Sequence, residues 1–255
     1  MIEIKHFNGA VLFRSETATN IREAVEEAVR ERVDLYGALL AHANLEGARL
    51  ASGHFNGAVF YRANLSGADL RYISAEGANF CVAKMEGARA QDADFAGAYM
   101  YQANMREVNA PNALLRGVSL GYANLNGANF DQADFSGALL ARTALRRTRI
   151  QGARFHGAAL DDARLDGAIL QPNLCLAGNL SVLTIGPIGS RDDVCTFYTT
   201  NKGTYVLAGC FFDTLAQFEH EVNKTHGDNV HGDDYRALIA LVRGREERRL
   251  RAEQT

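Results

Sequence analysis

The sequence predicts a four-sided β-helix, a tower of stacked square coils, with a short segment before it and a longer aperiodic segment after it. Three observations support this fold class. A large apolar residue returns at every fifth position from Leu35 to Leu170, which gives 28 consecutive units without an insertion or deletion. A compact residue, usually alanine, stands two places before each large one. The period starts near residue 33 and ends after residue 172.

A period of five fits neither regular structure that buries a single face. In a helix of 3.6 residues per turn it drifts round the axis, so no apolar face forms. In a strand, side chains alternate with period two, and an odd period defeats that alternation. A square coil satisfies the pattern, because each five-residue unit forms one side with its compact and its large apolar residue pointing inward. Only Ala75, Ala90 and Ala110 are small at the large position.

Glycine and Asn or Asp stand where such a coil must turn. Glycine often lies two residues after the large residue, as Gly37 and Gly57 do, and Asn or Asp often precedes it, as Asn44 and Asp69 do. Both types suit the demanding backbone dihedrals of tight corners. Four units to a coil give seven coils, which stack at the strand spacing into a tower roughly 30 Å tall.

The unit A(D/N)LxG resembles the pentapeptide-repeat family, over about 140 of the 255 residues. This resemblance implies a right-handed quadrilateral β-helix and a mainly β protein. It implies less about function, because the repeat residues serve the fold. The best-known members of the family resemble B-form DNA and bind DNA gyrase, helped by a strongly acidic surface.

Charge limits how far the gyrase comparison extends to this chain. Residues 33–174 hold 13 acidic and 13 basic side chains, so the tower is neutral and lacks that acidic excess. Binding of DNA gyrase by DNA mimicry therefore stays an alternative function. The candidates for a hidden acidic strip are Asp69, Asp92, Asp94, Asp131 and Asp134.

The segment before the tower predicts a cap. Residues 2–13 alternate as two strands would, with a two-residue hairpin turn at Asn8-Gly9. Asn20 predicts the start of a helix whose apolar stripe spans residues 21–29. Because the open end of a solenoid exposes strand edges and apolar core, we expect this stripe to cover the first coil.

After the tower, the pattern predicts a small α+β domain. Strands are expected at 182–185, 194–199 and 204–208 as a hairpin or three-stranded sheet, followed by a helix capped by Asp213 or Thr214 and a last helix ending in Arg243–Arg251. This segment contains GCFFDTLAQFEHEV and THGDN in that order. With these motifs it resembles the C-terminal domain of some phage and prophage pentapeptide-repeat proteins, which implies a viral or prophage origin. The predicted domains are 1–32, an N-terminal hairpin and capping helix, 33–172, the β-helix, and 173–255, the C-terminal α+β domain.

One side of the tower differs from the other three in its outward residues. It is centred on Leu40, Phe60 and the large residues at further steps of 20, and its first five coils carry one formal charge, Arg62. We call this side the tyrosine face. Its outward apolar and aromatic residues, with one cysteine, are Leu39, Val59, Tyr61, Cys81, Val82, Tyr99, Tyr101 and Tyr122.

An exposed column with tyrosines and few charges is typical of a protein interface, although tyrosine also suits ordinary β surfaces. The sequence therefore predicts a partner-binding site on the tyrosine face. The partner is either a second copy of the chain, which would make a homo-oligomer, or a target protein. The predicted partner-binding residues are Val59, Tyr61, Val82, Tyr99, Tyr101 and Tyr122.

Basic residues concentrate late in the chain, and they suggest a weaker alternative. They could bind nucleic acid or an anionic ligand. A solvated face on which they balance the charges of Asp161, Asp162 and Asp166 is the more usual explanation. Nucleic acid is therefore not the expected partner. The basic residues are Arg142, Arg146, Arg147, Arg149, Arg154, Arg164 and the run 243–251.

The C-terminal domain offers a second alternative, small-ligand binding or catalysis. Its cysteines and histidines lack the short regular spacing of a zinc site, so neither a metal nor a cofactor is expected. His226 and Asp228 could act as a base and its orienting partner beside a pocket at Cys210. A helix end followed by a turn explains both residues without catalysis, so no catalytic residue is assigned.

The bulk composition narrows the function class. A net charge of −3 and 22% charged residues do not suit a general nucleic-acid binder. No apolar run approaches the roughly 18–20 residues of a membrane span, and the N-terminus lacks the features of a signal peptide. Four cysteines without paired spacing fit reduced thiols in a cytoplasm. The sequence predicts a non-enzymatic cytoplasmic scaffold that binds a host protein, a phage-encoded modulator or antagonist.

Overall fold

The computed structural model describes residues 1–172, 174–177, 182–188, 193–209 and 211–253. It divides into two compact units, Met1–Asn179 and Leu180–Thr255. The second unit thus begins a few residues after the boundary that the loss of the period suggested. No helix within the described ranges is long and apolar enough to cross a membrane.

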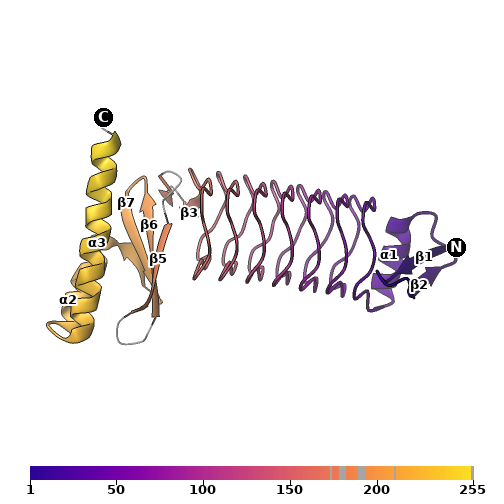
Figure 1. The fold of residues 1–255 in the computed structure, drawn as a ribbon, viewed down its shortest axis with the longest axis horizontal. Helices are drawn as coiled ribbons and strands as arrows, with labels where there is room; N and C mark the ends of the chain where they lie inside the picture. Colours follow the sequence, from indigo (N-terminus) through magenta and orange to yellow (C-terminus); the bar gives the residue numbers. More distant parts are fainter. Residues whose placement is uncertain (173, 178–181, 189–192, 210, 254–255) are drawn as a thin grey trace. The chain divides into compact units, whose positions relative to one another are not determined.

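The tower in the first unit is a right-handed β-helix in which each coil takes 20 residues (Figure 1). Parallel bridges join residues 20 apart, from Asp34 with His54 to Arg149 with Ile169. Backbone hydrogen bonds run between the same coils, as from the Leu35 N–H to the His54 carbonyl at 2.9 Å. The predicted five-residue units are therefore the sides of the coil, in the predicted register.

The interior columns match the prediction. Every residue at the large position from Leu35 to Leu170 is buried except Leu160, which is partly exposed. Neighbouring coils stack their aromatic rings, and the Phe60 and Phe80 rings lie parallel with centroids 4.7 Å apart. Full burial of such a side chain stabilises the fold by about 1.5–3 kcal/mol. Thr143, a polar exception in the compact column, donates its hydroxyl to the Leu120 carbonyl at 2.8 Å.

The corners extend the glycine pattern beyond what the sequence showed. At each corner the compact residue donates back to the large residue, as from the Ala38 N–H to the Leu35 carbonyl at 3.0 Å, and the residue between them with positive φ is typical of a type II turn. Glycine holds this position along two of the four edges, except at Glu107 and Arg147. Side chains hold it along the other two edges, including Val82 at a φ of 61°, except at Gly152. These left-handed non-glycine residues were not predicted, and each costs roughly 1–2 kcal/mol.

At the start of the chain, β1 (Ile2–Lys5) and β2 (Val11–Ser15) form an antiparallel hairpin. The predicted two-residue turn is wrong. The His6 N–H donates to the Ala10 carbonyl at 2.8 Å, which closes a three-residue loop with Gly9 at a φ of 93°. Such a loop needs a left-handed residue at its third position, and glycine supplies it without strain.

The hairpin and helix α1 (Ile21–Arg30) cover the edge of the first coil. The Leu39 N–H donates to the Lys5 carbonyl at 2.7 Å, and the Arg49 N–H donates to the Glu26 carboxylate at 2.8 Å. The side chain of Asn20 accepts from the Glu23 N–H, so it is the N-cap of α1 as predicted. The cap thus accepts hydrogen bonds from backbone N–H groups of the first coil that have no second-coil partner, which covers the exposed edge of the tower.

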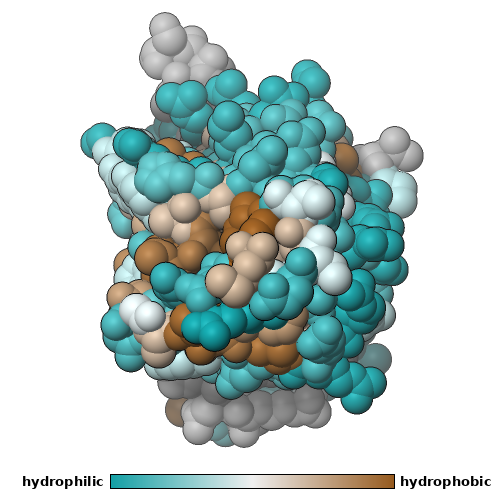
Figure 2. All heavy atoms as spheres, turned by 90° about the vertical axis from the view of Figure 1, so that its right-hand side faces the viewer, coloured by the Kyte–Doolittle hydropathy of each residue, from teal (hydrophilic) through white to brown (hydrophobic). Residues whose placement is uncertain are grey.

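The outer surface of this cap is partly apolar. Figure 2 views the molecule from its N-terminal end and shows apolar surface surrounded by polar side chains. Met1, Phe7 and Val11 are the exposed large apolar residues of the cap, with exposed fractions of 73%, 59% and 40%. This patch lies on the cap, whereas the tyrosine face lies along the tower.

After the last coil the chain folds back on the tower. Strand β3 (Ile169–Gln171) pairs with β4 (Leu174–Cys175) in antiparallel fashion. The Leu176 N–H donates to the Ala168 carbonyl at 2.8 Å, and the Gly167 N–H donates to the Leu176 carbonyl at 3.0 Å. Residues 174–176 therefore belong with the tower, so the predicted start of the C-terminal domain at residue 173 is too early.

The second unit is a four-stranded antiparallel sheet with two helices. The sheet has the order β5 (Val182–Ile188), β6 (Asp193–Thr200), β7 (Gly203–Ala208) and β8 (Phe211–Thr214), and the helices are α2 (Leu215–His226) and α3 (Val230–Glu253). The prediction of two or three strands missed β8. The hydroxyl of Thr214 accepts from the Gln217 N–H at 3.2 Å, which makes Thr214 the N-cap of α2.

Candidate protein-binding face

The six predicted partner-binding residues lie on one side of the tower. Tyr99, Tyr101 and Tyr122 are exposed by 57%, 42% and 47% of their surface. Val59, Tyr61 and Val82 are half-buried. The most exposed part of the tyrosine face is therefore its middle, where three aromatic side chains come from adjoining coils.

Contacts within the chain hold two of these rings in place. The rings of Tyr101 and Tyr122 meet edge to face with centroids 5.5 Å apart. The Tyr101 ring also lies against Gly121, where an added Cβ would be 3.4 Å from ring carbon Cδ2. Arg142 donates to the Tyr122 hydroxyl at 2.7 Å. Rings that are ordered before binding lose less conformational entropy when a partner arrives.

Tyr61 is more engaged with its own chain than the sequence indicated. The Arg62 guanidinium lies 5.1 Å from the centroid of its ring, and the His42 ring meets it edge to face at 5.7 Å. These neighbours leave Tyr61 half-buried. It therefore gives the face shape, whereas Tyr99 and Tyr101 offer the freer ring surface.

Exposed apolar residues outside the predicted set also bear on the site. Leu139, on the same side of the tower as Tyr99 and two coils further on, is 54% exposed. Because one coil takes 20 residues, two steps of 20 from Tyr99 lead to Leu139, so the sequence alone could have placed Leu139 on this side. Tyr36 and Tyr72 are 54% and 55% exposed on two other sides. They show that one exposed tyrosine does not make a face, and that the clustering of Tyr99, Tyr101 and Tyr122 is what sets this side apart.

The repeat identifies the family. Eight copies of the model for pentapeptide repeats match the chain, and together they span residues 31–171, more than half of its length. The chain belongs to the pentapeptide-repeat family. The comparison with curated proteins found no match to this sequence.

Solved structures of other pentapeptide-repeat proteins are similar to this one in part. HetL, involved in heterocyst differentiation regulation in the cyanobacterium Nostoc sp. strain PCC 7120, is 28% identical, and the match covers 52% of this chain and 73% of HetL with a TM-score of 0.34. QnrB1, a plasmid-mediated fluoroquinolone resistance protein, is 18% identical over 52% of this chain and 84% of its own, also with a TM-score of 0.34. These TM-scores are too low to carry a functional argument.

The other sides of the pentapeptide-repeat tower carry ion pairs. Asp69 accepts from Arg71 at 2.7 Å and from Arg89, one coil further on, at 3.0 Å. The hydrogen bond from Arg71 holds the pKa of Asp69 below its usual range. Asp134 pairs with Arg116 at 2.6 Å. These pairs join charges of opposite sign along the tower, so the charged sides remain balanced locally.

The acidic residues that could have formed a strip are matched by donors. Asp69 and Asp134 pair with arginines, and Asp131 pairs with Arg149 at 2.5 Å. The amide of Asn112 donates to Asp92 at 2.9 Å, and the Ala96 N–H donates to Asp94 at 3.0 Å. A bare acidic column of the kind that DNA mimicry requires is therefore not built from these five residues.

Three of the late arginines, Arg142, Arg146 and Arg149, are paired in the same way. Arg142 lies 3.4 Å from Asp162, and Arg146 lies 2.9 Å from Asp166. These contacts support the explanation that this region is a solvated, ion-paired surface. Exposed pairs of this kind contribute little to stability, about 0–1 kcal/mol each.

In the C-terminal unit, the described residues show no hydrogen bond between the two suggested catalytic residues, His226 and Asp228. His226 lines a cavity of about 220 Å³ with Cys195, Phe218 and Tyr235. Its ring lies 5.4 Å from that of Tyr235. Asp228 is exposed on the turn after α2. Cys210, the third residue of the hypothesis, lies outside the described residues.

Proposed function

We propose that this pentapeptide-repeat protein is a non-enzymatic scaffold that binds a protein partner through the tyrosine face. One observation carries the proposal: Tyr99, Tyr101 and Tyr122 are exposed together on the side of the tower with the fewest charges. A tyrosine that becomes buried at an interface contributes through its large apolar ring, and its hydroxyl can still form a hydrogen bond. Residues of this kind dominate the energetics of protein interfaces.

The charged sides support the same choice by contrast. Binding a partner over Asp69 or Asp134 would desolvate ion pairs with arginines, and the attraction within a buried pair often fails to repay that cost. Over Tyr99 and Tyr101 the surface removed from water is largely apolar, at about 25 cal/mol for each Å². A partner therefore gains most, and loses least, on the tyrosine face.

The partner that we propose is a host protein, with a second copy of the chain as the other occupant of the same face. The proposal further makes the protein a cytoplasmic, phage-encoded modulator or antagonist. That part rests on the resemblance of the C-terminal segment to phage and prophage proteins and on the four cysteines without paired spacing in the sequence. The balanced charge of the other sides does not favour DNA gyrase as that host protein.

A double substitution, Tyr99→Arg with Tyr101→Arg, tests the proposal. Both side chains are exposed, so the fold should persist with a melting temperature within about 2 °C of the parent, because surface changes usually alter stability by under 0.5 kcal/mol. We expect affinity capture from host lysate to lose its specific partner, and light scattering to show dissociation of any oligomer formed by the parent.

Tyr72→Arg is the matched control, because Tyr72 is 55% exposed on another side of the tower. It should keep both the captured protein and the mass in solution. If the double variant retains both as well, the tyrosine face is not the binding site. If Tyr72→Arg loses them equally, the loss reflects added charge on any side of the tower.

A further inference from the structure

One edge of the tower breaks its own glycine pattern. The edge after the side centred on Leu45 and Leu65 carries glycine in five of its seven coils: Gly47, Gly67, Gly87, Gly127 and Gly167. Glu107 and Arg147 take the other two places with φ of 55° and 56°, the same left-handed conformation that their glycine neighbours adopt. Since glycine adopts this conformation without strain, the fold does not require a side chain at either place. Side chains hold the same conformation on two other edges of the tower, so what sets Glu107 and Arg147 apart is that they bring side chains to an edge that is otherwise glycine.

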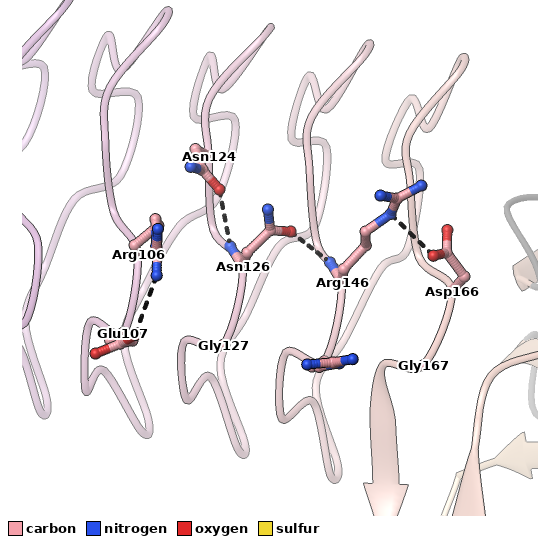
Figure 3. Close-up of a pocket in the computed structure, with 9 residues that line it drawn as sticks. Arg106, Glu107, Asn124, Asn126, Gly127, Arg146, Asp166 and Gly167 are labelled. Atoms are coloured by element: carbon pink, nitrogen blue, oxygen red, sulfur yellow. Dashed lines mark hydrogen bonds and ion pairs between the residues drawn. The ribbon is translucent and has the colours of Figure 1, made fainter.

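Both exceptions line one groove. The groove has a volume of about 690 Å³ and extends along the tower from Arg106 to Gly167. Glu107 and Arg147 flank Gly127 on its glycine edge. Figure 3 shows the opposite wall, where Asn126, Arg146 and Asp166 follow one another from coil to coil. We call this site the arginine groove.

The amides in the arginine groove are arranged to donate. The Asn124 side-chain oxygen accepts from the Asn126 N–H at 3.2 Å, and the Asn126 side-chain oxygen accepts from the Arg146 N–H at 2.8 Å (Figure 3). In both bonds the oxygen of the amide is the acceptor, and its NH₂ group takes no part. What the two side chains can still offer a ligand is therefore mainly N–H donors.

Ion pairing within the arginine groove involves two of its three arginines. Arg146 pairs with Asp166 at 2.9 Å, and Arg106 pairs with Glu107 at 3.3 Å, so both carboxylates in the lining are compensated. The third arginine, Arg147, has no carboxylate within ion-pair distance among the residues that the structure describes. The groove thus combines one uncompensated guanidinium with amide donors.

We propose that the arginine groove binds a phosphate group, with the guanidinium of Arg147 as its anchor. A guanidinium presents its N–H donors in a planar fork that matches two oxygens of a phosphate. The remaining oxygens need further donors, and the amides of Asn124 and Asn126 supply them. The phosphate is either free or carried on a larger molecule. This site lies on a different side of the tower from the tyrosine face and does not depend on it.

Calorimetric titration of the full chain with inorganic pyrophosphate, at constant ionic strength, tests the proposal. Arg147→Gly restores the residue that the same edge carries in neighbouring coils. It should weaken binding at least tenfold and leave the melting temperature equal to or above that of the parent, because it removes both the guanidinium and the left-handed strain. Glu107→Gly is the matched control, since it relieves the same strain but retains Arg147, and it should bind at least as tightly as the parent.

Arg147→Gln separates charge from strain. It keeps a side chain in the left-handed conformation and should lose binding without any gain in melting temperature. The proposal is overturned if the parent does not bind pyrophosphate at millimolar concentration, if Arg147→Gly binds as well as the parent, or if Arg147→Gly lowers the melting temperature, which would make Arg147 a structural residue. A phosphoserine peptide titrated beside pyrophosphate identifies the source: tighter binding of the peptide assigns the site to phosphorylated proteins, and tighter binding of pyrophosphate assigns it to free phosphates.

Discussion

The tower and the C-terminal unit bury their cores in different ways. In the tower, Phe60 packs in a column, and its ring stacks on that of Phe80 in the next coil at 4.7 Å. In the C-terminal unit, Phe218 lies in a cluster and meets the rings of Phe197, Phe211 and Tyr235 from three other elements. A destabilising substitution in the column should affect mainly the neighbouring coils, whereas one in the cluster should affect every element that packs there. The two units should therefore fail separately and in different ways.

Leu125→Asp should produce the largest effect. Leu125 is fully buried in the column, and a carboxylate there has no cation to pair with, a cost of several kcal/mol. We expect the tower to lose its β signal in circular dichroism and to become sensitive to protease around the fifth coil. Asn109→Asp, an exposed change on another side, is the control and should leave the tower folded. A folded, protease-resistant Leu125→Asp tower would show that the column tolerates charge.

Phe218→Ala should affect the other unit alone. The side chain is 5% exposed in the C-terminal cluster, and its removal should destabilise that unit by about 3–5 kcal/mol. Hydrogen exchange followed by mass spectrometry should show faster exchange in β6, β7 and α2 and unchanged exchange in residues 33–172. Faster exchange throughout the tower would mean that the two units unfold together.

Acid should weaken the tower gradually. Burial alone would raise the pKa of Asp134, but hydrogen bonds from Ser136 and Arg116 outweigh it and hold the pKa below its usual range. Since the folded-state pKa lies below the unfolded value of about 3.9, the contribution of Asp134 to stability is complete above that pH and is lost as the pH falls through the folded-state pKa.

The variant Asp134→Asn isolates this contribution. At pH 7 it should lose about 1–2 kcal/mol in urea unfolding, because a buried acceptor of charged and neutral donors is replaced by a weaker one. Between about pH 4 and pH 2 its stability should fall less steeply than that of the parent. Parallel slopes for the two proteins over that range would remove Asp134 as the source of acid sensitivity.

Most of the tower could be predicted because one pattern determines it. The period of five assigns Leu125 or Phe60 to the interior, and steps of 20 place Tyr99 and Leu139 on the same side. The left-handed side chains at Val82 and Arg147 could not be predicted in this way. Their conformation follows from the equal length of all the sides, which forces the same turn at every corner whatever residue stands there.

The ends and the C-terminal unit depended on contacts that leave weaker local signals. Strand β8 was missed because four residues that lead directly into a helix cap are too few to show an alternation. The return of Leu176 to the last coil is a tertiary contact without a turn motif of its own. On the tower surface, steps of 20 bring charges into reach, but they do not say that Asp134 pairs with Arg116 and not with another neighbour.

Because the five-residue repeat continues without interruption, the position of a residue within its 20-residue coil determines the side of the tower on which it lies. Because a coil takes 20 residues, an insertion of that length would add one rung and leave every face continuous. An insertion of five would turn everything after it by a quarter of a revolution. Placed just after Tyr101, it would carry Tyr122 and Leu139 round to the next side and leave Tyr99 and Tyr101 behind. Whether two side chains can contact the same partner therefore depends on the number of residues between them, which must be close to a multiple of 20, as well as on which residues they are.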